Sequence, residues 1–210
     1  MRDYTIHGDM ESRETGRFRT AARAFRVRVV FVEKARKGVK MPGPLHDIAA
    51  CSLFSLRLDW KGEFLDSVSL LLPHERSVPE IRTRLGGLVQ DALLEYAGGG
   101  LSSKWRWPEL PIPWAELGAF SRDVLQCLAE TVGPGDVVEY GVLAARAGHP
   151  NAARAVGTVM AKNRWVVIVP CHRVVSAGGR MGGYSAPGGL ASKRMLLDLE
   201  AGKGKSPEVI

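Results

Sequence analysis

The sequence predicts an α+β protein with a small strand-rich first half and a mostly helical second half. Stretches in the first half alternate apolar and polar residues with a period of two, which is typical of half-buried strands. Stretches in the second half repeat apolar residues every three to four positions, which is typical of amphipathic helices. The proline-rich segment WRWPELPIPW (105–114) lies between them, and we interpret it as a linker.

Three strands are expected in the first half. AFRVRVVFVE (24–33) alternates apolar and basic residues, and ACSLFSLRLDW (50–60) and GEFLDSVSLLLP (62–73) flank a short turn. The basic stretch KARKGVKMPGPLHD (34–47) is interrupted by prolines and glycines, so we expect a loop there.

One helix is expected within SVPEIRTRLGGLVQDALLEYAGGG (77–100). Ser77 is a candidate N-cap, Pro79 and Glu80 suit a first turn, and the three glycines at 98–100 end the helix. Its apolar residues at near-helical spacing are Ile81, Leu85, Leu88, Leu93 and Tyr96.

The second half contains two expected helices joined by a three-residue turn. EYGVLAARAG (139–148) and AARAVGTVMAKN (152–163) are separated by His-Pro-Asn, and Asn151 is the expected N-cap of the later helix. This is the outline of a helix-turn-helix, but an ordinary αα corner has the same pattern. Further amphipathic helices are expected at AFSRDVLQCLAETV (119–132) and GLASKRMLLDLEAG (189–202).

The composition is that of a globular protein in a reducing compartment. The 210 residues are 45% hydrophobic and 24% charged, and they contain no apolar run of the ~20 residues needed to cross a bilayer. Three well-separated cysteines and a polar N-terminus predict a cytoplasmic protein, or a nuclear one in a eukaryote, with free thiols. A net charge of +7 and a pI near 9.6 favour polyanionic partners, although many basic proteins bind none.

The most unusual stretch is VVIVPCHRVV (166–175), in which a thiol, an imidazole and a guanidinium are adjacent. Pro170 restricts the backbone just before Cys171 and can therefore fix the direction of the thiol. The basic neighbours His172 and Arg173 are expected to favour the thiolate, which is the nucleophilic form. The alternatives are a buried inert cysteine, a core histidine with satisfied hydrogen bonds, and an arginine paired with a carboxylate.

A carboxylate can complete this group. At about 100° per residue in the last expected helix, Glu200 falls on the same side as Leu190, Leu196 and Leu197. A histidine held by an inward-facing carboxylate through one ring nitrogen can relay a proton through the other. The alternative is a frayed helix end with the carboxylate in water. The glycine-rich stretch SAGGRMGGYSAPGG (176–189) can bring backbone N–H groups close to a planar ligand, or be a flexible connection.

Together these residues resemble the O6-alkylguanine-DNA alkyltransferase family. PCHRVV, preceded by EYGVLAARAG and NAARAVGTVMAKN and followed by GGYSAPGGLASKRMLL, is a highly specific match that runs from about Ile112 to Gly202. The resemblance implies DNA repair by irreversible, single-turnover transfer of a methyl or larger alkyl group from O6 of guanine to Cys171, with O4-alkylthymine as a further candidate substrate. The first half is similar only in its strand-rich outline to the family's ribonuclease-H-like N-terminal domain.

The resemblance also implies roles for individual residues. His172, acting through a water molecule, and Glu200 would ionise Cys171. Tyr140 would rotate the 3′ phosphate and hydrogen-bond to the guanine ring. Arg154 would fill the gap left when the damaged base is flipped out of the duplex.

Other matching positions imply a DNA surface and a substrate pocket. The helix that carries the arginine finger would enter the minor groove, and its small residues Ala152, Ala153 and Gly157 would allow close approach to the DNA backbone. An asparagine would brace the turn before the active site, and a loop would close over the base. The residues expected around the substrate are Asn163, Val174, Tyr184, Ser185 and Pro170.

Four segments follow from the pattern and the resemblance. Residues 1–24 are a polar segment that we expect to be poorly ordered, 25–111 an α/β domain with its linker, 112–203 the alkyltransferase domain with the helix-turn-helix, and 204–210 a tail. We expect a monomer that binds double-stranded DNA containing O6-alkylguanine, without a membrane partner or cofactor. No metal is expected, because Cys51 and His46 are too few for the zinc site of human-type relatives.

The sequence also departs from the family pattern in places. Val166 stands where some relatives carry proline, and Pro187 and Gly188 indicate a longer or stiffer active-site loop, which bears on the tolerance of bulky adducts. Alkyltransferase-like proteins, which bind lesions without repairing them, are the alternative function, but they lack the cysteine that is present here. A transcription factor with an incidental thiol or a cysteine hydrolase explains less of the pattern.

Overall fold

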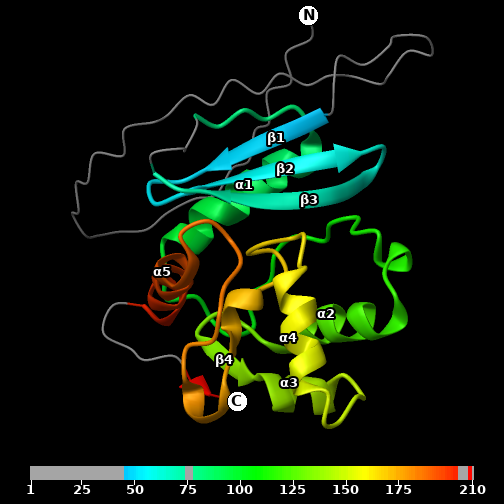
Figure 1. The fold of residues 1–210 in the computed structure, drawn as a ribbon. Helices are drawn as coiled ribbons and strands as arrows, with labels where there is room; N and C mark the ends of the chain where they lie inside the picture. The colour runs from blue at the N-terminus through cyan, green and yellow to red at the C-terminus, as the bar shows by residue number, and fades with distance from the viewer. Residues whose placement is uncertain (1–44, 74–77, 203–207, 210) are drawn as a thin grey trace, which may run out of the picture.

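The computed structural model describes residues 45–73, 78–202 and 208–209 as a mixed α/β structure with a small sheet and several helices (Figure 1). The sheet is antiparallel, in the order β1-β2-β3, and its strands are β1 (Leu45–Ala50), β2 (Ser55–Lys61) and β3 (Phe64–Leu71). The expected strand at 24–33 and the candidate cap Ser77 lie outside the described residues.

The sequence-based boundaries are wrong at β1. Residues 45–47 were expected in a loop and 51–54 in a strand, but β1 covers 45–50 and the chain turns at 51–54. β1 includes residues 45–47 because Asp47 has a buried hydrogen-bonding partner on β2. Asp47, which is fully buried, accepts a hydrogen bond of 2.7 Å from Trp60 Nε1 on β2, so this polar stretch is held in the sheet.

Helix α1 (Arg84–Ala97) packs on the sheet and is fixed to it through Asp47. Thr83 is its N-cap: its Oγ1 accepts from the Gly86 N–H at 2.8 Å and donates to Asp47 Oδ2 at 2.7 Å. A Cβ on Gly86 would lie 2.4 Å from the Asp47 carboxyl carbon, so this close approach requires glycine. The helix thus begins later than predicted, and Leu88 is 41% exposed rather than buried.

The outer edge of β3 is paired with two later segments. The Leu65 N–H donates to the Pro111 carbonyl at 3.0 Å, and the Val68 N–H donates to the Arg164 carbonyl at 2.7 Å. Trp165 Nε1 adds a hydrogen bond of 2.8 Å to the Leu65 carbonyl. The segment that leads to PCHR is therefore fixed directly to the sheet.

The rest of the described chain is mostly helical. The predicted helix at 119–132 is confirmed as α2 (Ala119–Thr131), and the other helices are α3 (Tyr140–Arg146), α4 (Ala153–Ala161) and α5 (Gly189–Ala201). A second small parallel sheet has the order β5-β4-β6, with β4 (Asp136–Glu139), β5 (Val174–Val175) and β6 (Glu208–Val209).

Two helix predictions are wrong in detail. Asn151 is not the N-cap of α4, because Ala152 occupies that position and Asn151 adopts a left-handed conformation (φ 69°) in the preceding turn, which asparagine tolerates. Leu190 is 51% exposed, so it does not share the buried side of α5 with Leu196 and Leu197, because it lies in the first turn at the surface.

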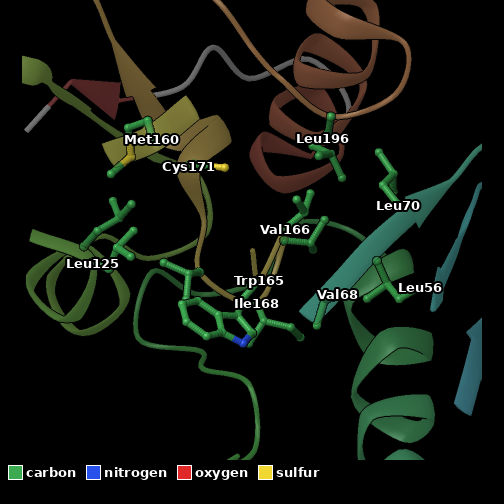
Figure 2. Close-up of a cluster of buried hydrophobic side chains, with 14 of the residues drawn as sticks. Leu56, Val68, Leu70, Leu125, Met160, Trp165, Val166, Ile168, Cys171 and Leu196 are labelled. Atoms are coloured by element: carbon green, nitrogen blue, oxygen red, sulfur yellow. The ribbon is translucent and has the colours of Figure 1, made fainter. Parts of the chain in front are cut away.

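One main hydrophobic core joins the sheet to the helices. Figure 2 shows Val68 and Leu70 of β3 in the same cluster as Trp165, Leu196 and Cys171. Cys171, the candidate nucleophile, therefore lies in a hydrophobic core to which both halves of the described chain contribute. None of the described helices is long and apolar enough to cross a membrane.

Candidate active site around Cys171

The backbone before Cys171 forms a tight, braced turn. Val169 N–H donates to the Trp165 carbonyl at 2.8 Å, and the Asn163 amide donates to the Val169 carbonyl at 2.8 Å. The other end of this amide, Oδ1, accepts from the Trp165 N–H at 3.0 Å. Val167 has φ 72°, which is unfavourable for a β-branched residue, and this residue is fully buried. The turn thus delivers Cys171 to a fixed place at the start of a 3₁₀ turn, Cys171–Arg173.

Cys171 lines a cavity of about 390 Å³. This volume is within the range of roughly 300–1,000 Å³ found for small-molecule sites. Among the expected pocket residues, Tyr184 and Ser185 line the cavity, whereas Asn163, Val174 and Pro170 are buried and do not line it, and Pro170 contributes to a different cavity. The remaining lining residues are Tyr140, Gly157, Met160, Ala161 and Gly183.

Glu200 faces inward and is 2% exposed. Its Oε1 lies 2.8 Å from His172 Nε2 and accepts from Arg173 NH2 at 2.7 Å. It also accepts from the Tyr96 hydroxyl at 2.5 Å. The sequence pattern left open whether this carboxylate is buried or frayed into water, and the structure places it in a buried network.

The electrostatics of this network favour an ionised carboxylate next to a neutral imidazole. Burial alone would raise the pKa of Glu200, but the charges of His172 and Arg173 and their hydrogen bonds lower it to about 2. Burial lowers the pKa of His172, and the nearby carboxylate offsets only part of this effect. With Nε2 donating to Glu200, Nδ1 of His172 is left as an acceptor, and it has no hydrogen-bond partner among the described residues.

The prediction that Arg173 favours the thiolate is wrong for this structure, and the same expectation for His172 stays a prediction. Arg173 points to Glu200 and to the Val132 carbonyl, which it contacts through NH1 at 2.6 Å, and not to the thiol. Burial raises the pKa of Cys171, so the resting group is a thiol that needs a base. The side-chain groups that oppose this increase are the Asn163 amide and the charge of Lys193.

Lys193 is a buried cation that the sequence reading missed. It is fully buried on α5, its Nζ donates to the Val174 carbonyl at 2.6 Å, and burial lowers its pKa to about 8. Its spacing from Leu196, Leu197 and Glu200 follows the helical repeat, so the helical pattern could have identified it.

Lys193→Met should raise the pKa of Cys171, because methionine fills a similar volume without the charge that stabilises the thiolate. We expect alkylation of Cys171 by iodoacetamide at pH 7 to become roughly three- to tenfold slower. The measurement is the rate at this cysteine as a function of pH, by mass spectrometry. Arg194→Met removes an exposed charge from the same helix and should leave the profile unchanged; equal profiles for all three proteins would contradict the role of Lys193.

The residues expected to contact DNA lie at the start of α3 and in or just before α4. Arg154 is exposed near the start of α4, and Ala152 and Ala153 beside it are half-buried. Tyr140 is half-buried at the start of α3, and burial and the nearby Cys171 raise its pKa. A Cβ on Gly157 would lie 4.0 Å from the Tyr140 ring. Tyr140 and Gly157 both line the thiol cavity, and Arg154 lies three residues before Gly157 on α4.

Within residues 45–73, 78–202 and 208–209, no three His, Cys, Asp or Glu side chains cluster in a way that could hold a metal ion.

Sequence comparisons identify relatives of this site and of much of the chain. Residues 119–202 match the family described as 6-O-methylguanine DNA methyltransferase, DNA binding domain. The methylated-DNA–protein-cysteine methyltransferase of Shigella flexneri is 40% identical over 149 residues, which are 69% of this chain and 82% of that protein. The human protein of the same name is 48% identical over 90 residues, 43% of this chain. In four mammalian relatives the match spans only 42% to 47% of their length.

Solved structures extend the similarity to the fold. The O6-methylguanine methyltransferase of Mycobacterium tuberculosis has a TM-score of 0.57 at 30% identity, over 76% of this chain and 93% of that one. OGT of the same organism in complex with DNA has a TM-score of 0.53 at 33% identity, over 70% and 86% of the two chains. The similarity therefore includes the sheet as well as the helices, and the chain belongs to the methylated-DNA–protein-cysteine methyltransferase family.

Proposed function

We propose that this protein repairs DNA by transferring an alkyl group from O6 of guanine to Cys171, once per molecule. The observation that supports this most directly is a buried thiol in the wall of a base-sized cavity, adjacent in sequence to a histidine that is held by a buried carboxylate. The names of the relatives above point to the same chemistry. Cys171 also argues against the alternative of a lesion-binding protein without transfer activity, because that class lacks the acceptor.

The reaction balances with the groups present. His172 Nδ1, acting through a water molecule, takes the thiol proton while Glu200 holds the imidazole through Nε2. The sulfur attacks the alkyl carbon, a carbon–sulfur bond forms as the carbon–O6 bond breaks, and the bonding electrons return to guanine. Guanine then takes up the proton that the thiol lost. The thioether is not reopened by any of these groups, so each molecule reacts once.

The cavity also offers groups to recognise the base. The Tyr184 hydroxyl is buried and has no hydrogen-bond partner among the described residues, and burial raises its pKa, so it remains a donor. Tyr184 and Ser185 both line the cavity that contains Cys171. We assign these side chains to contacts with the flipped base, and Tyr140 to the 3′ phosphate and the ring.

The partner is double-stranded DNA that carries the lesion, bound by a monomer. We assign α3 and α4 to a helix-turn-helix whose second helix enters the minor groove, with Arg154 filling the space of the flipped nucleotide. The division into a ribonuclease-H-like domain at 25–111 and an alkyltransferase domain at 112–203 is part of this proposal. The small, half-buried residues Ala152, Ala153 and Gly157 at the start of α4 and within it support a close approach to the backbone.

The test is an oligonucleotide duplex with a single labelled O6-methylguanine. We expect the label to move to the protein up to one equivalent and then stop, with the methyl group on the peptide that contains Cys171 by mass spectrometry. Continued turnover or no transfer would contradict the proposal.

Arg154→Ala should slow repair of duplex DNA much more than reaction with the free base. The arginine offsets part of the unstacking cost of a few kcal/mol, which free O6-methylguanine does not incur. We therefore expect at least a tenfold lower rate on duplex DNA and a less than twofold change on the free base. Arg146→Ala is a control for loss of an exposed positive charge near the same surface. Equal slowing on both substrates would exclude the role.

A further inference from the structure

We propose that Tyr96 is a positioning residue of the active site, through which α1 holds the Glu200 carboxylate toward His172. This inference rests on the proposed alkyl transfer and assigns part of it to the strand-rich half of the chain. Tyr96 and Glu200 are 104 residues apart in sequence, yet the tyrosine hydroxyl donates to Glu200 Oε1 at 2.5 Å. The accepting oxygen is the one that lies 2.8 Å from His172 Nε2.

Packing alone does not account for the hydroxyl. The Tyr96 ring is 1% exposed and lies against Phe54, Trp105 and Trp107, with ring centroids 6.4, 5.8 and 5.3 Å away. A phenylalanine would fill this aromatic box equally well. A hydroxyl there must leave water and is stabilised only by a hydrogen bond, which Glu200 provides. Burial and the Glu200 charge raise the pKa of Tyr96, so it remains a donor.

A backbone contact between α5 and the segment after α1 keeps the Tyr96 and Glu200 side chains close to each other. Figure 1 shows the end of α1 beside α5, and the Gly100 N–H donates to the Leu199 carbonyl at 3.3 Å. Gly99 has φ 71°, and a Cβ there would lie 2.8 Å from the same carbonyl oxygen, so the contact requires glycine. The loop that follows Tyr96 thus contacts the residue that precedes Glu200.

The Tyr96 hydroxyl affects the pH at which His172 loses its proton. Glu200 Oε1 accepts from a neutral donor, Tyr96, as well as from the imidazole and the guanidinium. Removal of the neutral donor makes the carboxylate more basic, so it binds the protonated imidazole more strongly and His172 stays protonated to higher pH. The titratable or charged groups that act on this carboxylate are Tyr96 from α1, His172 and Arg173 from the 3₁₀ turn and Tyr184 from the loop before α5, and Lys193 of α5 acts on His172.

Tyr96→Phe in the full-length chain tests this role. We expect label transfer to be about three- to tenfold slower at pH 7. We also expect the acid limb of the pH–rate profile to move to higher pH, which loss of folded protein would not cause. The matched control is Trp107→Phe, which alters the aromatic box but keeps the Tyr96 hydroxyl. In the wild type, Trp107 Nε1 has no hydrogen-bond partner among the described residues, so this change removes no hydrogen bond within that part of the chain. Its acid limb should coincide with that of the wild type.

A wild-type rate and profile for Tyr96→Phe, or a slower rate with an unshifted acid limb, would overturn the inference while leaving alkyl transfer intact. Failure of the wild-type protein to accept label would instead reject the proposed function. Iodoacetamide titration of Cys171 separates the two, because it needs no DNA. There too, we expect the onset of reaction in Tyr96→Phe to move to higher pH relative to Trp107→Phe.

Discussion

Cys171→Ser is expected to accept no label from O6-methylguanine in DNA. A serine hydroxyl has a much higher pKa than a thiol, so a neutral imidazole cannot ionise it to a useful extent, and we expect at least a 1,000-fold loss of rate. Serine is close in size to cysteine, and the site is 5% exposed, so the fold should be retained. The measurement is label bound to protein, together with circular dichroism of the variant.

Cys127→Ser is the matched control for this change. Cys127 is a half-buried free thiol on α2, close to the Thr131 hydroxyl and not among the residues that line the thiol cavity. The Cys127→Ser protein should accept one equivalent of label at the wild-type rate. Label on the Cys171→Ser protein, or loss of transfer in the control, would show that the acceptor is a different cysteine.

Glu200→Gln should be the most damaging change outside the thiol itself. It leaves the buried guanidinium of Arg173 without its counter-charge and leaves His172 without a carboxylate to orient it. Removal of one partner from a buried ion pair costs about 3–5 kcal/mol, and loss of a positioned base costs about 100-fold in rate. Urea denaturation and label transfer measure the two effects. Asp198→Asn, an exposed carboxylate on the same helix, should change the free energy of unfolding by less than about 0.5 kcal/mol.

The pH dependence of stability gives a second test of Glu200. Its pKa of about 2 in the folded protein is below the usual 4.5, despite burial, because His172 and Arg173 stabilise the anion. A lowered folded-state pKa contributes stability above pH 4.5, and this contribution is lost as the pH falls toward 2. The difference corresponds to about 3 kcal/mol. Glu200→Gln should lack this loss between pH 4.5 and 2; an unchanged acid dependence would contradict the assignment.

Local sequence patterns pointed to Cys171 as a candidate nucleophile and to Glu200 as a candidate carboxylate partner. PCHR is an unusual juxtaposition in one short stretch, and the 3.6-residue repeat allowed an inward Glu200 but left a frayed helix end open. The helices at 119–132 and 189–202 were predicted within one or two residues. The sequence is informative where a residue and the pattern that predicts its position lie in the same helix or turn.

The failures have a common physical cause, which is that they depend on contacts between distant segments. β1 begins with Leu-His-Asp directly after a proline, and it becomes a strand because β2 supplies a partner for Asp47. No local pattern links Tyr96 to Glu200. The direction of the Arg173 side chain could not be predicted either, because adjacent residues in a 3₁₀ turn point to different sides. Arg173 reaches the Glu200 carboxylate rather than the Cys171 thiol.

The left-handed backbone at Val167 has a consequence for the order of folding. A β-branched residue in this conformation is disfavoured by about 1–3 kcal/mol, so a short peptide with this sequence would not adopt the turn. Its shape depends on support from Asn163 and from the hydrogen bonds of residues 164–165 with β3. We therefore expect Cys171 to reach its final place late in folding, after the sheet has formed an edge for this segment. In native-state hydrogen exchange, the amides of Val68 and Val169 should open together.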